Sequence, residues 1–285
     1  MSSFAASSDN QKIAIVTGSS RGIGYEASLA LARSGFMTYA TIRNLEKQDA
    51  IRTAATKENL LIRVVQLDVT SENSIKKAIE AIISEVGRID LLVNNAGYGL
   101  TGAFEDLAMD EIKAQYETNF FGLIMVTQAV LPTMRKQGSG RIINISSGAG
   151  RFGYPGGSAY VSTKFALEGL SESMAYKLEQ FGIKVVLIEP GVIRTNFEAV
   201  IARKSNDPSS PYSDMMKMMS SRMGEFFEKD SDPDLVAKVI VEAATSSNPK
   251  LRYLAGKDVE QWIAARNTMS DEQFRTMMMQ GRNEH

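Results

Sequence analysis

Tyr160 and Lys164 are the two residues whose types and spacing most directly suggest acid–base chemistry. The stretch from Ser158 to Glu179 has helical periodicity, so these side chains, four residues apart, project from one face and can approach one reacting atom. A free tyrosine has a pKa of about 10 and is a poor base near neutrality, but a neighbouring ammonium group favours the phenolate. Taken alone the pair is weak support for function, because most such pairs lie on helix surfaces.

The composition argues against several other chemistries. The chain has 285 residues, no cysteine and a single histidine, His285, at its end. Disulfides, thiolate nucleophiles, structural zinc sites, Ser-His-Asp hydrolysis and histidine bases are therefore not expected. Lys+Arg total 32 and Asp+Glu total 33, so the net charge of −1 favours neither nucleic acid nor an anionic membrane as a partner. Proton chemistry must come from Tyr, Lys, Asp or Glu.

A glycine-rich segment, Thr17-Gly18-Ser19-Ser20-Arg21-Gly22-Ile23-Gly24, comes directly after a predicted strand and opens a predicted helix. In that context it predicts a nucleotide site: Gly18 suits a sharp turn, Gly22 a close approach to pyrophosphate, and Gly24 tight packing of helix on strand. Backbone N–H groups and the helix dipole then point at the anion. The alternative is a tight turn that needs glycine for geometry alone.

The second predicted strand ends Ala40-Thr41-Ile42-Arg43-Asn44, without an acidic residue. In an NAD site a carboxylate there accepts a hydrogen bond from the ribose 2′-hydroxyl, whereas a basic residue accommodates a 2′-phosphate. Arg43, with Arg21 as a second cation, therefore favours NADP(H) over NAD(H). The alternative is that both are ordinary solvated arginines.

Short β-branched runs alternate with amphipathic stretches as far as about residue 190, which predicts βαβ units and a parallel sheet covered on both faces. Ser71 is the expected N-cap and Gly87 the expected stop of one helix, and Asp232-Pro233 is expected to cap and begin another. Two further helical pieces are expected at Val259–Arg266 and Asp271–Met279. The predicted strands are Lys12–Val16, Met37–Thr41, Ile62–Leu67, Asp90–Asn94, Arg141–Ile145, Lys184–Glu189 and Leu251–Leu254.

We find no internal repeat, linker or domain boundary, so a flexible tail at 1–11 and one domain at 12–285 are expected. Residues 195–231 lack strand signals and are expected to form an irregular or helical substrate lid. The longest clean apolar run, Phe120–Val126, has 7 residues, too few to span a bilayer. The N-terminus lacks the features of a signal peptide, and a cytoplasmic location is expected.

Further motifs occur in a fixed order: Asp68 in L-D-V-T, Asn94-Asn95-Ala96-Gly97, Asn119, Ser146-Ser147, Tyr160 to Lys164, and Pro190-Gly191 leading to Thr195. Together with the glycine segment they resemble the short-chain dehydrogenase/reductase family over residues 12–255. The resemblance implies a doubly wound α/β Rossmann fold with a seven-stranded parallel sheet and helices on both faces. It also implies hydride transfer between a nicotinamide coenzyme and a carbonyl or alcohol.

The catalytic set that the resemblance implies is Asn119, Ser147, Tyr160 and Lys164. The family's serine lies 13 residues before its tyrosine, which selects Ser147 over Ser146. Ser147 and Tyr160 would polarise the carbonyl oxygen and Tyr160 would supply the proton; Lys164 would bind the ribose and lower the tyrosine pKa, and Asn119 would position a water. Asp68 would meet the adenine and Thr195 the carboxamide. The implied coenzyme-binding residues are Gly18, Ser20, Arg21, Gly22, Ile23, Gly24, Arg43, Asp68, Val69, Asn95, Ala96, Gly97, Tyr160, Lys164, Pro190, Gly191, Val192 and Thr195.

Substrate is expected beyond the carboxyl ends of the strands, among largely apolar residues. Nine of the 15 methionines follow residue 210, and they suit either a lid over apolar substrates or core and dimer packing. The segments 40–43, 164–169 and 249–253 look like the 17β-hydroxysteroid and retinol dehydrogenase branch, which implies a lipophilic carbonyl or alcohol. The expected lining residues are Tyr98, Phe152, Tyr154, Val192, Ile193 and Met215–Phe227.

Two other functions share features with this sequence. A non-catalytic NADP-binding regulator could use the same fold, although the intact Ser147, Tyr160 and Lys164 argue against it. Sugar epimerases and dehydratases share the Tyr and Lys but usually space their glycines differently. Family members commonly pair through two helices, here Asp110–Lys136 and Ser158–Glu179, so a homodimer or homotetramer is expected. The expected contact residues are Phe120, Leu123, Phe165 and Leu170.

Overall fold

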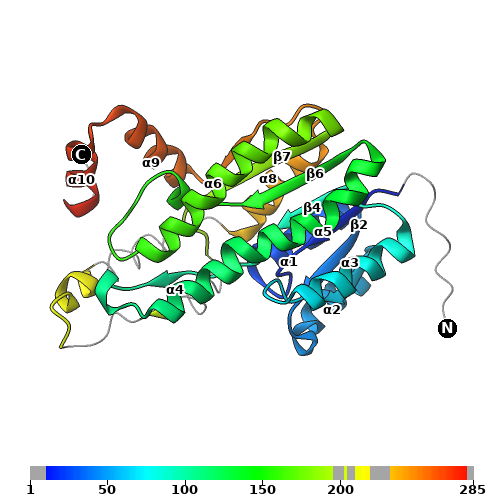
Figure 1. Ribbon diagram of the computed structural model, residues 1–285, viewed down its shortest axis with the longest axis horizontal. Helices are drawn as coiled ribbons and strands as arrows, with labels where there is room; N and C mark the ends of the chain where they lie inside the picture. The colour runs from blue at the N-terminus through cyan, green and yellow to red at the C-terminus, as the bar shows by residue number, and fades with distance from the viewer. Residues whose placement is uncertain (1–10, 195–201, 204–208, 219–231, 281–285) are drawn as a thin grey trace.

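The computed structural model describes residues 11–194, 202–203, 209–218 and 232–280. Its centre is a parallel sheet of seven strands in the order β3-β2-β1-β4-β6-β7-β9 (Figure 1). The strands are β1 (Ile13–Val16), β2 (Met37–Ile42), β3 (Ile62–Gln66), β4 (Leu91–Asn94), β6 (Gly140–Ile145), β7 (Ile183–Pro190) and β9 (Arg252–Ala255). The fold is the Rossmann-like α/β architecture that the sequence predicts.

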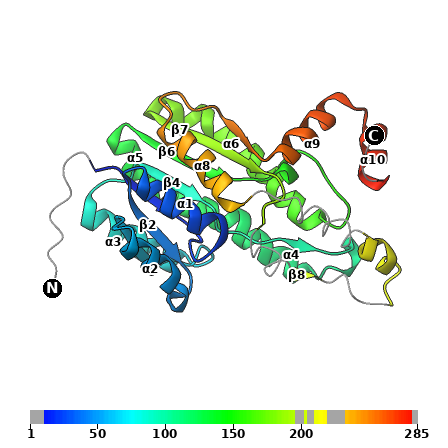
Figure 2. The ribbon, with the colours of Figure 1, turned by 180° about the vertical axis from the view of Figure 1, so that it is seen from behind.

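Helices cover both faces of the sheet (Figures 1 and 2). One face carries α3 (Glu72–Val86), α5 (Gly122–Gln137) and α6 (Ser158–Leu178). The other carries α1 (Gly22–Arg33), α2 (Asp49–Lys57) and α8 (Pro233–Thr245). Each face therefore buries its own hydrophobic core.

Strand β1 shows why the sequence folds this way. All of its residues are fully buried, and successive side chains of a strand point to opposite faces. Ile13 and Ile15 pack in the core beneath α3 and α5, whereas Ala14 and Val16 pack in the core beneath α1 and α8. A continuous apolar run is thus what a central parallel strand requires.

The strand order reverses at β1, which pairs with β2 on one side and with β4 on the other. The loops that follow β1 and β4 therefore leave the same edge of the sheet side by side. Such a reversal is where doubly wound proteins bind ligands, beyond the carboxyl ends of the strands. The glycine segment and Asn95 both lie at this point.

The predicted strands agree with the observed ones to within one residue at each end. The expected cap and stop around α3 are confirmed, because Ser71 Oγ accepts a hydrogen bond from Ser74 N and Gly87 has a φ of 68°. Helix α8 begins at Pro233 and Asp232 is its N-cap, as predicted. The Asp232 side chain makes no cap hydrogen bond and instead accepts hydrogen bonds from Arg194.

Two other features differ from the prediction. The expected helix from Asp110 to Lys136 consists of α4 (Met109–Tyr116), a π-helical turn at Glu117–Phe121, and α5. The expectation that residues 195–231 hold no strand is also wrong, because β8 (Ala202–Arg203) pairs in parallel with β5 (Leu100–Thr101). A pairing of only two residues leaves too short a pattern to recognise in a sequence.

The chain ends described by the structure lie at opposite ends of the molecule (Figure 1). Gln11, placed in the expected tail, donates a hydrogen bond from Nε2 to the Gly35 oxygen at 2.6 Å, and the rest of that tail lies outside the described residues. Helices α9 (Lys257–Thr268) and α10 (Asp271–Gln280) extend from the body. Among the helices described, none has the length and apolar character needed to cross a membrane.

Candidate active site

Ser147, Tyr160 and Lys164 come together at the carboxyl edge of the sheet. Ser147 lies just after β6, while Tyr160 and Lys164 lie one turn apart near the start of α6. The side chains of Ser147 and Tyr160 are hydrogen bonded. Lys164 donates from Nζ to the Ile145 oxygen at 2.8 Å, and its Nζ lies 5.6 Å from the centre of the Tyr160 ring. The three side chains can therefore act on one bound group.

Burial determines the protonation states of this trio. It raises the pKa of Tyr160 to about 12, and the hydrogen bond from Ser147 opposes that rise. Burial lowers the pKa of Lys164 to about 8, and the carboxylate of Glu168 opposes that fall. Near neutrality Tyr160 is thus a phenol with a proton to donate, and Lys164 is an ammonium ion close to its titration range.

Asn119 lies in the π-helical turn and is 3% exposed. Its Oδ1 accepts from the Tyr98 backbone N–H at 3.0 Å, and its Nδ2 donates to the Tyr98 oxygen at 2.8 Å. Nδ2 also reaches Thr163 Oγ1 at 3.4 Å, on the helix that carries Tyr160. The Asn119 side chain is thus committed to joining the loop after β4 to α6, and π-helical turns are frequent at functional sites.

The glycine segment has the backbone geometry of a phosphate loop. Gly18 and Gly22 have φ values of 72° and 60°, which other residues rarely adopt. A Cβ at Gly24 would lie 2.4 Å from both Asn95 Nδ2 and the Gly18 oxygen, so the tight approach is to the loops rather than to the strand. Arg21, the N-cap of α1, provides no side-chain cap. The first N–H groups of α1 therefore remain available to an anion, which fits a dinucleotide pyrophosphate.

Thr17 and Asn95 connect the two loops at the strand-order reversal. Thr17 Oγ1 accepts from the backbone N–H groups of Asn95 and Ala96 at 2.9 and 3.0 Å. Asn95 Nδ2 donates to the oxygens of Thr17 and Gly18 at 2.9 and 3.3 Å. The sequence analysis predicted that Asn95 binds the coenzyme, but it did not predict the hydrogen bonds between Asn95 and Thr17. A Cβ placed on the nearby Gly97 would lie 3.2 Å from Asn119 Oδ1.

The cations expected to meet a 2′-phosphate are both exposed. Arg43 directly follows β2, and Ser19 N donates to the Thr41 oxygen at 2.9 Å, which holds the glycine segment against the end of β2. Arg21 is therefore presented near the same edge as Arg43. No acidic residue stands between Thr41 and Asn44 to grip a 2′-hydroxyl. Two exposed arginines therefore lie where the sequence predicts the 2′ position of the coenzyme.

The remaining coenzyme residues lie around this edge. Asp68 is half-buried, and its Oδ1 accepts from the N–H and the hydroxyl of Thr70 at 3.0 and 2.8 Å. Val69 is buried against the start of α5, where a Cβ on Gly122 would lie 2.7 Å from its oxygen. Ser20, Ile23 and Ala96 are partly buried, and Thr195 lies outside the described residues.

Asp258 on α9 holds the loop that follows β7. Its Oδ2 accepts from the Val192 N–H at 2.7 Å, and a Cβ on Gly191 would lie 2.1 Å from its Oδ1. Pro190 is buried, while Gly191 and Val192 remain partly exposed. The sequence analysis did not identify Asp258. The signal that could have done so is a carboxylate two residues after Gly256, which directly follows the last strand.

Two of the residues expected to line the substrate site, Phe152 and Ile193, are core residues instead. Tyr98, Tyr154 and Val192 are partly exposed. Phe152 is instead 4% exposed and packs edge-to-face against Trp262 and Phe274, and Ile193 belongs to the core beneath α8. Both were expected to line the pocket because they follow strands, but the C-terminal helices and α8 cover them.

Residues 209–218 are the longest part of the expected lid that the structure describes. Met216 is 5% exposed and lies against Gly156, where a Cβ would be 3.0 Å from its Cε. Ser210 donates to Asp106 Oδ2 at 2.7 Å, and Tyr212 donates to Glu105 Oε2 at 3.0 Å. Of the methionine segment 215–227, residues 219–227 lie outside the described residues.

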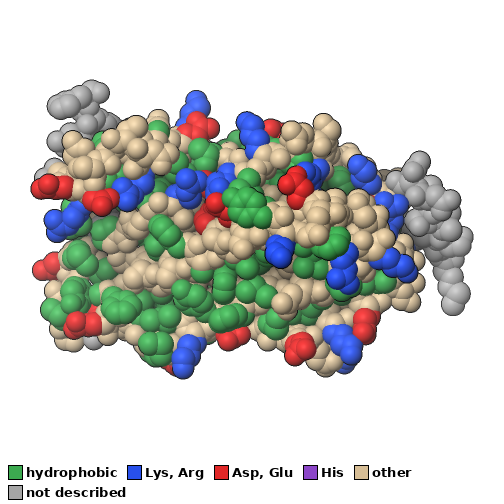
Figure 3. Space-filling view, turned by 45° about the horizontal axis from the view of Figure 1, so that its top comes forward, with side chains coloured by type: hydrophobic (Ala, Val, Ile, Leu, Met, Phe, Trp, Pro, Cys, Tyr) green, Lys and Arg blue, Asp and Glu red, His purple; other side chains and the backbone are tan. Residues whose placement is uncertain are grey.

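The two helices expected to pair subunits expose apolar side chains. Phe121 and Phe165 are 45% and 47% exposed, and hydrophobic side chains gather in the lower half of the face shown in Figure 3. Leu123 was expected to join this surface, but it is 6% exposed and packs with Leu167 in the core. Phe120 and Leu170 are partly buried.

The family model for short chain dehydrogenases matches residues 12–206. The chain is 44% identical over 257 residues to the uncharacterized oxidoreductase YusZ of Bacillus subtilis, covering 88% of this chain and 91% of the relative. It is 36% identical over 257 residues to retinol dehydrogenase 8 of Bos taurus, covering 86% of this chain and 81% of the relative.

Solved structures agree with these relatives. A short-chain dehydrogenase from Streptomyces avermitilis superposes with a TM-score of 0.80 at 31% identity, covering 96% of each chain. A metagenomic short-chain oxidoreductase in complex with NADP superposes with a TM-score of 0.69 at 27% identity, covering 85% of this chain and 96% of that one. The chain therefore belongs to the short-chain dehydrogenase/reductase family and resembles its retinol dehydrogenase branch.

Proposed function

We propose that the protein is an NADP(H)-dependent oxidoreductase that interconverts a carbonyl and an alcohol on a lipophilic substrate. The observation that carries the proposal is the grouping of Ser147, Tyr160 and Lys164 at the same edge of the sheet as the α1 N-terminus, which has no side-chain cap. A hydroxyl pair and a cation placed together suit a reaction in which negative charge develops on an oxygen.

When bound, a nicotinamide coenzyme supplies or accepts the hydride. In reduction, the hydroxyls of Ser147 and Tyr160 hydrogen bond to the carbonyl oxygen of the substrate. Tyr160 then gives its proton to that oxygen, and the ammonium of Lys164 stabilises the phenolate that remains. In oxidation the phenolate takes the proton from the alcohol. A water positioned by Asn119 beside Lys164 would return the proton to Tyr160.

The coenzyme preference is supported by Arg43 and Arg21, and by the NADP bound in the metagenomic relative. The lipophilic substrate is supported by the partly exposed Tyr98 and Tyr154 near the site and by the similarity to retinol dehydrogenase 8. Steroid, retinoid and fatty carbonyls are the classes we propose.

Residues 12–285 form one oxidoreductase domain, in which 195–231 covers the substrate, and the contacts of Ser210 and Met216 support that role. The exposed Phe121 and Phe165 support assembly of a homodimer or homotetramer through the stretches Asp110–Lys136 and Ser158–Glu179. The lack of cysteine supports a cytoplasmic location.

The test is NADPH consumption with a panel of lipophilic ketones and aldehydes. Tyr160→Phe should lower kcat by about 100-fold or more while NADPH binding stays nearly intact, because only the transferable proton is lost. Tyr176→Phe is the matched control, because Tyr176 lies on the same helix and is 75% exposed. Retention of a tenth of the rate would remove Tyr160 from the mechanism, and no consumption with any substrate would favour a non-catalytic regulator.

A further inference from the structure

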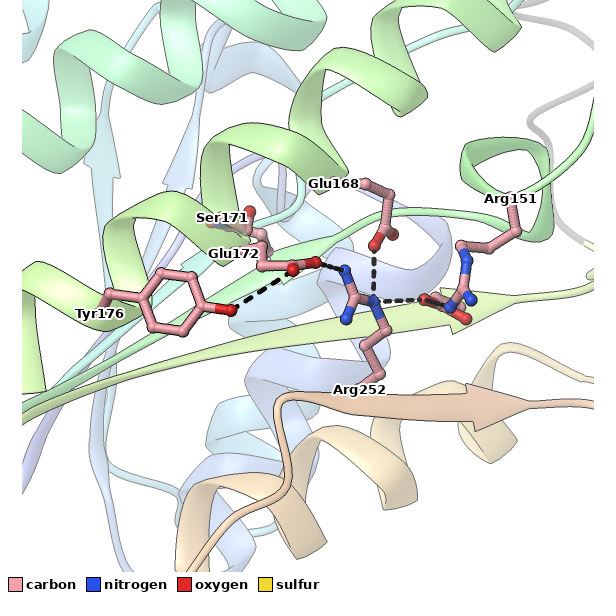
Figure 4. A network of polar contacts seen from close by, with 8 residues as sticks. Arg151, Glu168, Ser171, Glu172, Tyr176 and Arg252 are labelled. Atoms are coloured by element: carbon pink, nitrogen blue, oxygen red, sulfur yellow. Dashed lines mark hydrogen bonds and ion pairs between the residues drawn. The ribbon is translucent and has the colours of Figure 1, made fainter.

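A cluster of charged side chains connects α6 with β9 and with the end of β7 (Figure 4). Arg252 of β9 reaches α6, where its Nε lies 2.9 Å from Glu168 Oε2 and its Nη2 lies 2.6 Å from Glu172 Oε2. The same Nε lies 3.3 Å from Oε1 of Glu189, at the end of β7. One guanidinium therefore serves three carboxylates, two of which are buried.

Arg151 adds a second cation to this cluster. Its Nη1 lies 3.1 Å from Glu189 Oε1, and it follows the short 3₁₀ turn that begins after Ser147. Glu189 directly precedes Pro190 and Gly191, and Glu168 lies one turn after Lys164. The cluster thus joins the segments that carry Ser147, Lys164 and the loop held by Asp258.

Glu168 and Glu189 are too close, and too deeply buried, for both to be ionised without cost. Both touch one nitrogen of Arg252, so their contacting oxygens are at most about 6 Å apart, within the range of like-charge repulsion. Glu168 Oε1 and Glu189 Oε2 have no hydrogen-bond partner among the described residues. Burial and the charge of Glu168 raise the pKa of Glu189 to about 7. Glu189 is therefore partly protonated near neutrality.

The geometry indicates which carboxyl holds that proton. The Glu189 side chain is 0% exposed, and its contacts to Arg151 and Arg252 are 3.1 and 3.3 Å long. The Glu168 side chain is 7% exposed, has the shorter 2.9 Å contact to Arg252, and lies one turn after Lys164 on α6. The more deeply buried Glu189 is therefore the carboxyl that holds the proton.

We propose that Glu168 is a positioning residue that keeps Lys164 an ammonium ion, and that Glu189 stores the proton that allows Glu168 to remain charged beside it. The charged and titratable groups around the pair are Arg151, Glu172, Arg252 and Lys164, with Tyr160 next to Lys164. The inference deepens the proposed function, because a neutral Lys164 could not stabilise the Tyr160 phenolate. The charge of Lys164 can nevertheless be measured without turnover.

The direct experiment follows the ¹⁵N shift of the Lys164 amine against pH in the full chain, with the signal assigned by its loss in Lys164→Met. Glu168→Gln keeps the side-chain shape and should lower the midpoint of the Lys164 titration by about one pH unit, because the opposing carboxylate is gone. The alkaline fall of kcat/KM should move down by the same amount. Glu168→Asp should restore most of the midpoint.

Two variants separate this role from support of the fold. Glu172→Gln removes another carboxylate from Arg252 and should leave the Lys164 midpoint in place. Glu189→Gln mimics the protonated form and should also leave it nearly unchanged. An unchanged midpoint in Glu168→Gln, or an equal fall in Glu189→Gln, would overturn the inference. If Glu168→Gln does not fold, the Glu168→Asp and Glu189→Gln midpoints decide, and a fall of one unit in both overturns it. An inactive protein that titrates as expected would contradict the proposed function alone.

Discussion

Asp258 accepts a hydrogen bond from the backbone N–H of Val192 at 2.7 Å, so a residue of the C-terminal α9 holds the loop that follows β7. The fit depends on glycine, because a Cβ on Gly191 or Gly256 would lie 2.1 or 2.5 Å from Asp258 Oδ1. This loop carries the coenzyme residues expected after Pro190. Its shape is therefore controlled by a segment outside the residues matched by the family model.

Asp258→Ala should weaken NADPH binding by about 5- to 150-fold, because the loss of the partner leaves a part-buried N–H unsatisfied, at about 1 to 3 kcal/mol. Fluorescence titration of NADPH measures the change. Asp258→Asn keeps an acceptor oxygen and should stay within about threefold of the parent. Equal affinities in the parent and the alanine variant would show that the loop keeps its shape without this bond.

Arg43→Asp should reverse the coenzyme preference. A carboxylate repels a 2′-phosphate yet accepts from a 2′-hydroxyl, and hydrogen bonds to charged groups contribute about 1.5 to 3 kcal/mol each, or roughly 10- to 150-fold. Exposure of Arg43 reduces this effect. The ratio of kcat/KM for NADPH and NADH with one carbonyl substrate measures it before and after the change, with Arg52→Asp on exposed α2 as the control. A wild type that uses both coenzymes equally would make Arg43 a surface charge only.

Glu189→Gln should alter how stability depends on pH. The pKa of Glu189 is about 7 in the folded chain and about 4.3 in an unfolded one, so the wild type loses stability as pH rises through that interval, by about 1 to 3 kcal/mol. The glutamine variant lacks this loss and should gain stability relative to the wild type between pH 5 and pH 8. Thermal unfolding at both pH values measures the difference.

Glu172→Gln, in the same cluster, should change the pH dependence of stability in the opposite direction. Arg252 lowers the pKa of Glu172, so its stabilising effect is present above the unfolded pKa and is lost as pH falls. That variant should therefore lose relative stability as pH rises through the acid range below about pH 5, and its stability relative to the wild type should stay constant between pH 5 and pH 8. For Glu189, the contradicting result is a stability difference between the wild type and Glu189→Gln that is the same at pH 5 and pH 8. It would mean that Glu189 does not titrate between those pH values.

The sheet could be predicted because a parallel strand buried on both faces leaves a strong local pattern. The apolar run of β1 is such a pattern, and the predicted ends of every strand in the seven-stranded sheet agree to within one residue. The pairing of β5 with β8 could not be predicted, because it joins two-residue segments that lie about 100 residues apart in sequence. Asp232 is the predicted N-cap of α8, but its side chain makes no capping hydrogen bond for a similar reason, since it binds Arg194, which lies 38 residues away in sequence.

In the candidate site too, some residues could be predicted from the sequence and others could not. Motif order brings Ser147, Tyr160 and Lys164 together, and the structure describes them in contact. The partners that adjust them come from elsewhere in the chain: Arg252 reaches Glu168 across 84 residues, and Asp258 reaches Val192 across 66. Such pairs depend on how the sheet places its last strand, which no local pattern records.

The two loops that Thr17 and Asn95 join have a consequence for how the chain folds. Gly24 packs against Asn95 and the Gly18 oxygen, yet Asn95 lies more than 70 residues further along the chain. The phosphate loop cannot take its final shape until β4 has docked beside β1. Contacts this distant in sequence form slowly, because the intervening chain must first give up its freedom. Coenzyme binding is therefore a late event in folding, and a fragment that ends before β4 cannot acquire it.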